Sequence, residues 1–273
     1  DWTIAGKPLL RLDTADKLTG KQKYGIDLVQ PNMLNAAVRA CPVFGGKLAS
    51  FDAAAVEKMP GVRKVVQVDD TAVAVVADTW WRAKTALEAL PITWDEGPNA
   101  GLSSAAIADM LVEGLDAKEA FVGNAAGDAL AAIARGGKVI TATYAYPYQS
   151  HATMEPMNAL DLYTPERCEV WAPTQSAESA LEAAAEAAGL PIAQCDLHKV
   201  HLGGGFGRRG AGDYIRQAVL IAKQMPGTPI KLIWSREEDM THCQYHPITM
   251  CKLVGGLDAQ GKYQEAVFNL RAK

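Results

Sequence analysis

The chain has no long hydrophobic run, no cluster of cysteines and no excess of basic residues. Because no apolar run approaches the ~20 residues that cross a bilayer, the sequence predicts no membrane-spanning helix. The five cysteines include no C-x-x-C pair and no group of four, which argues against a disulfide framework and an iron–sulfur cluster. The basic residues are scattered and the formal net charge is −4, so nucleic-acid binding has little support.

The first residues, Asp1 to Ile4, lack both an initiator methionine and the pattern of a signal peptide. We therefore expect a chain cut from a longer one. The composition is that of an ordinary globular protein, with 273 residues, 49% of them hydrophobic and 21% charged. This length is sufficient for two domains that each have a core.

Turn residues divide the chain into four consecutive segments. We expect a lead-in arm at 1–22, a compact α/β domain at 23–97, a connecting segment at 98–137 and a second α/β domain at 138–273. The expected strands are 23–28, 33–39, 62–68, 72–77, 92–94, 139–145, 159–163, 168–171, 195–201, 230–234, 248–254 and 263–270. The expected helices are 51–59, 79–90, 103–113, 128–134, 176–188 and 213–224.

A glycine-rich loop at residues 201–210 links the strand expected at 195–201 to the helix expected at 213–224. Residues 203–210 contain five glycines, which allow positive φ and let successive N–H groups converge on an acceptor. Phe206 alone adds bulk, and Arg208 and Arg209 would place two positive charges at the lip. Such a junction holds an anionic or oxo-bearing ligand. A flexible glycine turn is an equal alternative for the loop taken alone.

Two further turns carry polar groups that suit a ligand. In residues 151–159 (HATMEPMNA), Glu155 stands next to a proline in a rigid turn and can orient a ligand; the alternative is a surface turn with a salt-bridged glutamate. In residues 171–176 (WAPTQS), a strand ends and a helix begins, so Thr174 can cap the helix and Gln175 can point into a cleft. A neutral amide can donate to a metal-oxo oxygen without adding charge. A plain helix cap is the alternative.

Residues 234–240 (WSREEDM) end a strand in a charged turn, which in isolation indicates a solvated face. His242 and His246 follow with i, i+4 spacing. Because the stretch is not clearly helical and Pro247 follows, we do not expect a zinc site there.

The motifs gain specificity from their order along the chain. They are Gly6-Lys7-Pro8, Tyr24-Gly25-Ile26-Asp27, Trp94-Asp95-Glu96-Gly97, Met154-Glu155-Pro156, Pro173-Thr174-Gln175, Gly203 to Arg209 and Arg236 to Met240. In this order the chain resembles the molybdenum-binding large subunit of the xanthine dehydrogenase and aldehyde oxidase family, and most closely its isoquinoline 1-oxidoreductase β-subunit branch. The resemblance covers nearly the whole chain. It implies an α+β (mixed α/β) fold, with the family's α/β "hammerhead" domain at 23–97 and the first part of its molybdopterin-binding domain at 138–273.

The resemblance implies that the full-length protein binds molybdenum with molybdopterin cytosine dinucleotide. Gln175 would hydrogen-bond an oxo ligand of the metal, and Phe206 and Tyr245 would line the substrate pocket. The cofactor-binding residues that it implies are Gln175, Gly203, Gly204, Gly205, Phe206, Gly207 and Arg208. No residue of this chain is expected to ligate the metal directly. The family's general-base glutamate is expected downstream, so the chain would hold no catalytic residue.

The family oxidises a C–H group next to nitrogen or oxygen and takes the oxygen from water, so the resemblance implies an oxidoreductase. Purine-oxidising members carry a substrate-binding glutamate where this chain has Arg209-Gly210, and a substrate-binding arginine near Tyr245. The loss of both implies an N-heteroaromatic substrate such as isoquinoline, or an aldehyde. Because both halves of the subunit would hold the cofactor, we expect this chain alone to be inactive and free of cofactor.

The partners implied are a small [2Fe–2S] subunit, the remainder of the chain's own subunit and a small-molecule substrate. For the location, export to the bacterial periplasm by a twin-arginine signal and a place in the cytoplasm both stay open. Two alternatives come from other classes: a non-catalytic nucleotide- or phosphate-binding module, and a docking module. The loop lacks the Lys-Ser/Thr of a P-loop and the spacing of a dinucleotide fingerprint.

Overall fold

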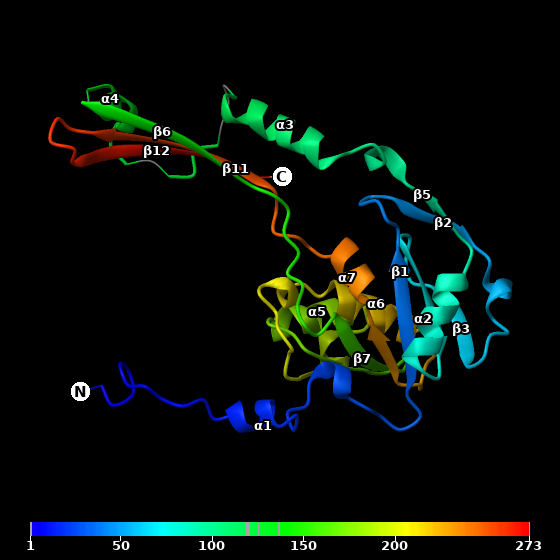
Figure 1. Cartoon of the computed structure of the whole chain (residues 1–273). Helices are drawn as coiled ribbons and strands as arrows, with labels where there is room; N and C mark the ends of the chain where they lie inside the picture. Colours follow the sequence, from blue (N-terminus) through cyan, green and yellow to red (C-terminus); the bar gives the residue numbers. More distant parts are fainter. Residues whose placement is uncertain (1, 118–120, 125, 136, 273) are drawn as a thin grey trace. The chain divides into compact units, whose positions relative to one another are not determined.

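A computed structural model of the chain describes residues 2–117, 121–124, 126–135 and 137–272, with the backbone alone for 264–272 (Figure 1). The chain forms two compact units, and each is made of two separate segments. The first unit contains Asp1–Pro98 and His151–Cys243, and the second contains Asn99–Ser150 and Gln244–Lys273. One division between the units falls between Pro98 and Asn99, next to the boundary expected at 97, whereas the boundary expected at 137 lies inside the second unit. The four-segment division into family domains stays a prediction.

A seven-stranded mixed sheet forms the centre of the first unit, in the order β3-β4-β1-β10-β7-β8-β9. Its strands are β1 (Leu34–Ala40), β3 (Val62–Gln67), β4 (Ala72–Ala77), β7 (Asn158–Tyr163), β8 (Cys168–Ala172), β9 (Cys195–Lys199) and β10 (Ile230–Ile233). β1 pairs in parallel with β10, and β8 with β9; the other neighbours are antiparallel. A separate antiparallel pair joins β2 (Lys47–Phe51) to β5 (Ile92–Asp95).

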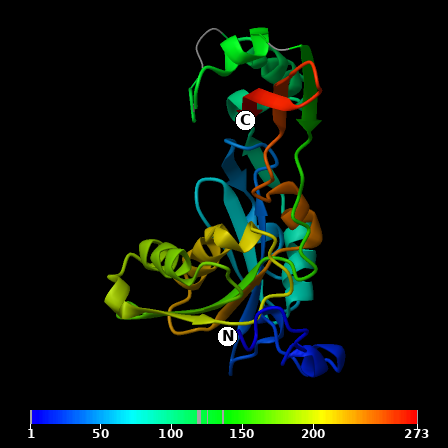
Figure 2. The same cartoon turned by 90° about the vertical axis from the view of Figure 1, so that its left-hand side faces the viewer.

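Helices cover both faces of the seven-stranded sheet. α2 (Trp80–Ala89) packs on one face, and α5 (Ala177–Ala188) and α6 (Asp213–Ala222) pack on the other. In β4, the side chains of Ala74 and Val76 belong to the α5/α6 core, whereas those of Val73 and Val75 belong to the α2 core. A strand buried on both faces has a continuous apolar run, which is why residues 72–77 were readily predicted. In Figure 2 the green-yellow α5 and the yellow α6 lie together on one side of the strands.

The second unit contains a three-stranded antiparallel sheet in the order β12-β11-β6. Its strands are β6 (Lys138–Tyr146), β11 (Thr249–Leu257) and β12 (Tyr263–Ala272), and its helices are α3 (Ser104–Leu115) and α4 (Ala129–Arg135). Ile107 and Leu111 of α3 form a small core with Ile248. The side chain of Ser103 caps α3 by accepting the N–H of Ala106. Within the described parts of the chain, no helix is both long and apolar enough to cross a membrane.

Two expected elements are wrong. Residues 23–28 form a single turn, η1 (Gly25–Asp27), because the Asp27 carboxylate accepts the N–H of Tyr24 and the Lys231 ammonium binds two carbonyl oxygens of this segment. The helix expected at 51–59 is reduced to η2 (Ala53–Ala55), since residue 51 already ends β2 and Asp52 caps only one turn.

Two helices were missed. α1 (Thr14–Leu18) lies in the predicted lead-in arm, and α7 (Arg236–Thr241) replaces the charged turn expected after β10. Ser235 caps α7 by accepting the N–H of Glu238. The remaining short turns are η3 (Gly97–Asn99), η4 (Ile192–Gln194) and η5 (Arg208–Gly210). The other predicted helices and strands are found, with ends that differ by a few residues. The α+β fold class is therefore confirmed.

Candidate functional site

The glycine loop (residues 201–207) leaves β9 and ends in η5, just before α6. Its φ angles are positive at Gly204 (103°), Phe206 (56°) and Gly207 (102°). A positive φ is strained for a residue with a side chain, and such strain clusters at functional sites. The Phe206 side chain is 70% exposed. The loop therefore holds an aromatic ring at the surface on a backbone conformation that residues with a side chain rarely adopt.

Three successive N–H groups of the loop, at Gly204, Gly205 and Phe206, have no acceptor among the described residues. The groups on either side are satisfied. The Gly203 N–H donates to Glu155 Oε2 at 2.7 Å, and the Gly207 N–H donates to Gln175 Oε1 at 3.0 Å. Backbone N–H groups seldom lack an acceptor unless water or a ligand supplies one. This row of donors suits an anion or an oxo group.

Gln175 lies over the loop at the place where Gly205 has no side chain. A Cβ atom on Gly205 would lie 2.5 Å from Gln175 Oε1, so any other residue there would displace the amide. Because the Gly207 N–H can only donate, its bond fixes Oε1 toward the loop and leaves the amide NH₂ as a donor. The expectation that Thr174 caps α5 is wrong. Its hydroxyl is buried and instead accepts the N–H of Ser176 and donates to the Arg209 carbonyl.

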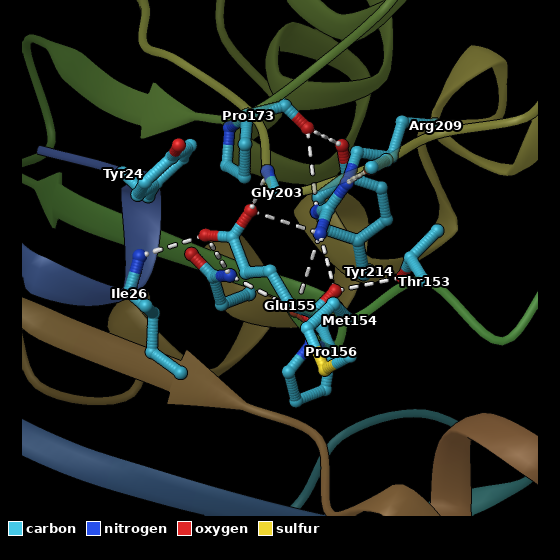
Figure 3. Close-up of polar contacts among 12 residues, drawn as sticks. Tyr24, Ile26, Thr153, Met154, Glu155, Pro156, Pro173, Gly203, Arg209 and Tyr214 are labelled. Atoms are coloured by element: carbon cyan, nitrogen blue, oxygen red, sulfur yellow. Dashed lines mark hydrogen bonds and ion pairs between the residues drawn. The ribbon is translucent and has the colours of Figure 1, made fainter. Parts of the chain in front are cut away.

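Glu155 is the polar centre of this region, as Figure 3 shows. Its side chain is only 5% exposed. Oε1 accepts from the Ile26 N–H (2.9 Å) and Asn158 Nδ2 (3.0 Å), and Oε2 accepts from the Gly203 N–H (2.7 Å) and Arg209 Nη2 (3.1 Å). The alternative of a surface turn is therefore wrong. The carboxylate joins four segments of the first unit.

The two arginines after the loop are buried, contrary to the expectation that they place charges at its lip. Arg208 is 1% exposed and Arg209 is 0% exposed. Both guanidinium groups are already paired, Arg209 with Glu155 at 3.1 Å and Arg208 with Asp213 at 2.7 Å. Burial lowers the pKa of Arg209 and outweighs the opposing charge of Glu155. The role of Arg208 in cofactor binding stays a prediction.

The charged motif at 236–240 is also partly buried, which corrects the expectation of a solvated face. Glu238 is 6% exposed and Asp239 is 1% exposed. Arg236 forms an ion pair with Asp239 and donates to the carbonyl oxygens of Thr153 and Met154. Burial raises the pKa of Asp239 and outweighs the charge of Arg236 beside it. The motif thus holds the turn that carries Glu155.

Both ring nitrogens of His242 have polar partners. Its Nδ1 lies 3.1 Å from Glu238 Oε1, and its Nε2 lies 2.8 Å from the carbonyl oxygen of Cys41. Burial lowers the pKa of His242, but these two partners raise it by more. His246 belongs to the second unit. In the part of the chain that the structure describes, no three His, Cys, Asp or Glu side chains group as metal ligands do.

A cavity of about 580 Å³ borders the loop at Gly203 and Gly204. Tyr24, Met154 and Leu202 also line it, and its size falls in the range of small-molecule sites. Tyr245, predicted to line the substrate pocket with Phe206, lies in the second unit, where its ring centroid is 5.9 Å from that of Tyr148. The role of Tyr245 stays a prediction.

Sequence reasoning missed two side chains that pair with residues of the predicted motifs. They are Asn158, which donates to Glu155, and Asp213, which pairs with Arg208. The only signal was spacing, since Asn158 follows Glu155 by three residues and Asp213 opens the predicted helix after the loop. Neither pattern indicates a partner by itself.

Comparison with known proteins places these residues in a family. Residues 115–272 match the model of the molybdopterin cofactor-binding domain. The chain is 29% identical over 267 residues to the membrane-bound aldehyde dehydrogenase [pyrroloquinoline-quinone] of Gluconacetobacter polyoxogenes, covering 95% of this chain and 34% of that protein. It is 27% identical over 264 residues to isoquinoline 1-oxidoreductase subunit beta of Brevundimonas diminuta, covering 92% of this chain and 33% of that protein.

The fold is shared with solved structures. The crystal structure of quinoline 2-oxidoreductase from Pseudomonas putida 86 matches with a TM-score of 0.77 and 20% sequence identity, over 96% of this chain and 38% of that one. The chain thus spans about a third of the length of these curated relatives.

Proposed function

We propose that this chain, which belongs to the molybdopterin cofactor-binding domain family, forms the first part of the large subunit of a molybdenum hydroxylase. The relatives are named as a dehydrogenase and an oxidoreductase, which supports an oxidoreductase function. The observation that carries the proposal is the row of N–H groups at Gly204, Gly205 and Phe206, beside the amide of Gln175, for which the described residues supply no acceptor.

These residues fit the cofactor chemically. A pterin and an oxo-bearing metal both present hydrogen-bond acceptors, and the loop offers donors that the described protein leaves without an acceptor. The glycines at 203–205 have no side chain to hold a ligand away from the backbone. When bound, the cofactor supplies the oxidation of a substrate carbon with oxygen from water. Gln175 would donate to an oxygen of the metal centre, and the loop N–H groups would orient the cofactor.

We propose an N-heteroaromatic or an aldehyde as the substrate. The names of the relatives include isoquinoline and aldehyde substrates. The charge of Arg209 is taken up by Glu155, so this arginine is not available to a polar substrate. The exposed ring of Phe206 can stack on a flat aromatic molecule. Phe206 and Tyr245 would border the pocket.

The cofactor form and the partners are also proposals. We infer molybdopterin cytosine dinucleotide as the form of the cofactor, and a small [2Fe–2S] subunit as the electron acceptor. The name "subunit beta" of the isoquinoline relative supports a second polypeptide. The general base and the other wall of the cofactor site would come from the remainder of the large subunit. This chain alone would therefore be inactive and free of cofactor.

The test uses the longer polypeptide that contains this chain, produced with its small subunit in a host that makes the molybdenum cofactor. Stoichiometric molybdenum and oxidation of isoquinoline or an aldehyde are the expected results. Gln175→Ala should abolish most of the activity, whereas Gln194→Ala, an exposed glutamine in η4, should retain it. A quinone in place of molybdenum would contradict the proposal. Phosphate binding by this chain without molybdenum in the longer one would favour a phosphate-binding module.

A further inference from the structure

We propose that the Glu155–Arg209 ion pair is a positioning element, which sets the shape of the glycine loop and the direction of the Gln175 amide. Neither residue would touch the substrate. The effect on cofactor binding rests on the proposed function, whereas the effect on the loop does not.

The Glu155 carboxylate receives one donor from each of four segments. These donors belong to Ile26 in η1, Asn158 at the start of β7, Gly203 in the loop and Arg209 in η5. Each oxygen accepts two of them, so the carboxylate has no spare capacity. A shift of Glu155 would therefore break contacts to several segments together.

Arg209 carries this constraint to both sides of the loop. Its Nε donates to the Gly204 carbonyl at 2.8 Å, and its own carbonyl accepts the N–H of Gln175 at 3.0 Å. The Gln175 side chain then accepts the N–H of Gly207. The three unpaired N–H groups at 204–206 thus lie between two anchored positions. Both anchors lead back to the ion pair.

The packing leaves little room for the pair to move. A Cβ atom on Gly203 would lie 2.5 Å from the Glu155 Cβ, which shows how closely the loop backbone passes the glutamate stem. The Arg209 side chain is fully buried and also donates to the Glu155 carbonyl at 2.6 Å. Buried charges of this kind are strongly coupled to the groups that satisfy them.

Glu155→Gln is the most direct test, because it keeps the shape of the side chain and replaces one acceptor oxygen by a donor NH₂. On either orientation of the amide, a donor then faces donors. The matched control is Asp213→Asn, which weakens the ion pair of Arg208, the other buried arginine of the same turn. The Asp213 carboxylate bonds Arg208 at 2.8 and 2.7 Å, and within the described residues it makes no hydrogen bond to positions 203–207.

The readout is residue-resolved amide hydrogen exchange of this chain, without cofactor. Glu155→Gln should speed exchange at Gly203, which it bonds directly, and also at Gly207, which it does not. We expect exchange at Gly207 to be at least about tenfold faster. Asp213→Asn should leave exchange at Gly207 unchanged. Unchanged exchange at Gly207 in Glu155→Gln would overturn the proposal.

Arg209→Lys is a second variant in case Glu155→Gln does not fold. It keeps the charge but loses the guanidinium fork that reaches both Glu155 and Gly204. Faster exchange at Gly207 in this variant supports the proposal, and unchanged exchange overturns it.

The molybdenum content of the longer polypeptide separates this inference from the proposed function. If Gly207 exchanges faster in Glu155→Gln, and molybdenum falls several-fold in that variant but not in Gln194→Ala, both stand. If Gly207 exchanges faster and the molybdenum content stays the same, the positioning role stands and the loop is not the cofactor wall.

Discussion

Two buried carboxyl groups stand six residues apart, in opposite surroundings. Glu155 accepts four hydrogen bonds and pairs with a buried arginine. Asp161, in the middle of β7, is 0% exposed, and neither of its oxygens has a hydrogen-bond partner among the described residues. Burial raises the pKa of Asp161 well above its ordinary value, because it disfavours the charged carboxylate. One acid fastens segments of the chain, and the other is tolerated inside an apolar core.

Within the described part of the chain, no group donates a hydrogen bond to the Asp161 carboxyl. Burial also raises the pKa of Cys168 to about 12, and Cys168 lies opposite Cys195 where β8 pairs with β9. In such a core a buried carboxyl group costs much less free energy in its neutral form than in its charged form. The contrast shows that a buried carboxyl group joins segments of this chain where donors surround it, as around Glu155, and does not where they are lacking, as around Asp161.

Glu155→Ala should have the largest effect on stability. Removing one partner of a buried ion pair leaves an uncompensated charge on Arg209, which costs about 3–5 kcal/mol. Denaturant unfolding of the chain measures this as a lower midpoint at an unchanged slope. Asp213→Ala, whose carboxylate is 30% exposed, should cost less. An equal loss of stability in both variants would contradict the view that Glu155, which contacts several segments, matters more for stability than Asp213, which pairs with Arg208.

Gly205→Ala tests the loop side of the comparison. The new methyl would collide with the Gln175 amide, and overpacking of this kind costs about 1–3 kcal/mol. In a Gln175→Ala background the colliding atoms are gone, so the same change should cost much less. Unfolding of the four proteins of this double-mutant cycle gives the coupling energy. Additive effects would show that Gln175 does not occupy the space beside Gly205.

Asp161→Asn tests the core side. The folded pKa of Asp161 is raised, so the folded state keeps a proton that the unfolded state loses above about pH 4. The stability of the native chain should therefore fall as the pH rises from about 4 toward the folded pKa, by about 1.4 kcal/mol for each pH unit crossed. Asp161→Asn should lack this pH dependence, so its free energy of unfolding should rise relative to that of the native chain as the pH rises. Parallel stability curves from about pH 4 to 8 would contradict the burial of an unpartnered acid.

Lys252→Ala should have the smallest effect. Lys252 pairs with Asp116 in the second unit, where the Asp116 side chain is 78% exposed. Exposed pairs contribute about 0–1 kcal/mol and are screened by salt. Thermal unfolding at low and high salt should barely separate the variant from the native chain. A large loss would mean that burial is not what distinguishes Glu155.

The sequence predicts elements with a strong local pattern and misses those fixed by distant partners. Residues 72–77 are a continuous apolar run, and the glycines at 203–205 mark the loop directly. By contrast, the residue type of Arg209 does not show whether its side chain is exposed at a loop or buried against Glu155. The turn at 23–28 is set by Lys231, far away in the chain. Local periodicity contains no information about such contacts. The sequence therefore predicts where the loop and the arginines lie along the chain, but not which residues they contact.

The parallel pairing of β1 with β10 has a consequence for the folding of the chain during its synthesis. The two strands are separated by roughly 200 residues of chain. At translation rates of about 5–20 residues per second, β10 is synthesised about 10–40 s after β1. Throughout that interval one side of β1 is an open template for other strands. The hairpin of β3 and β4 pairs with the opposite edge of β1, so it leaves this edge open until β10 emerges, after the glycine loop has left the ribosome.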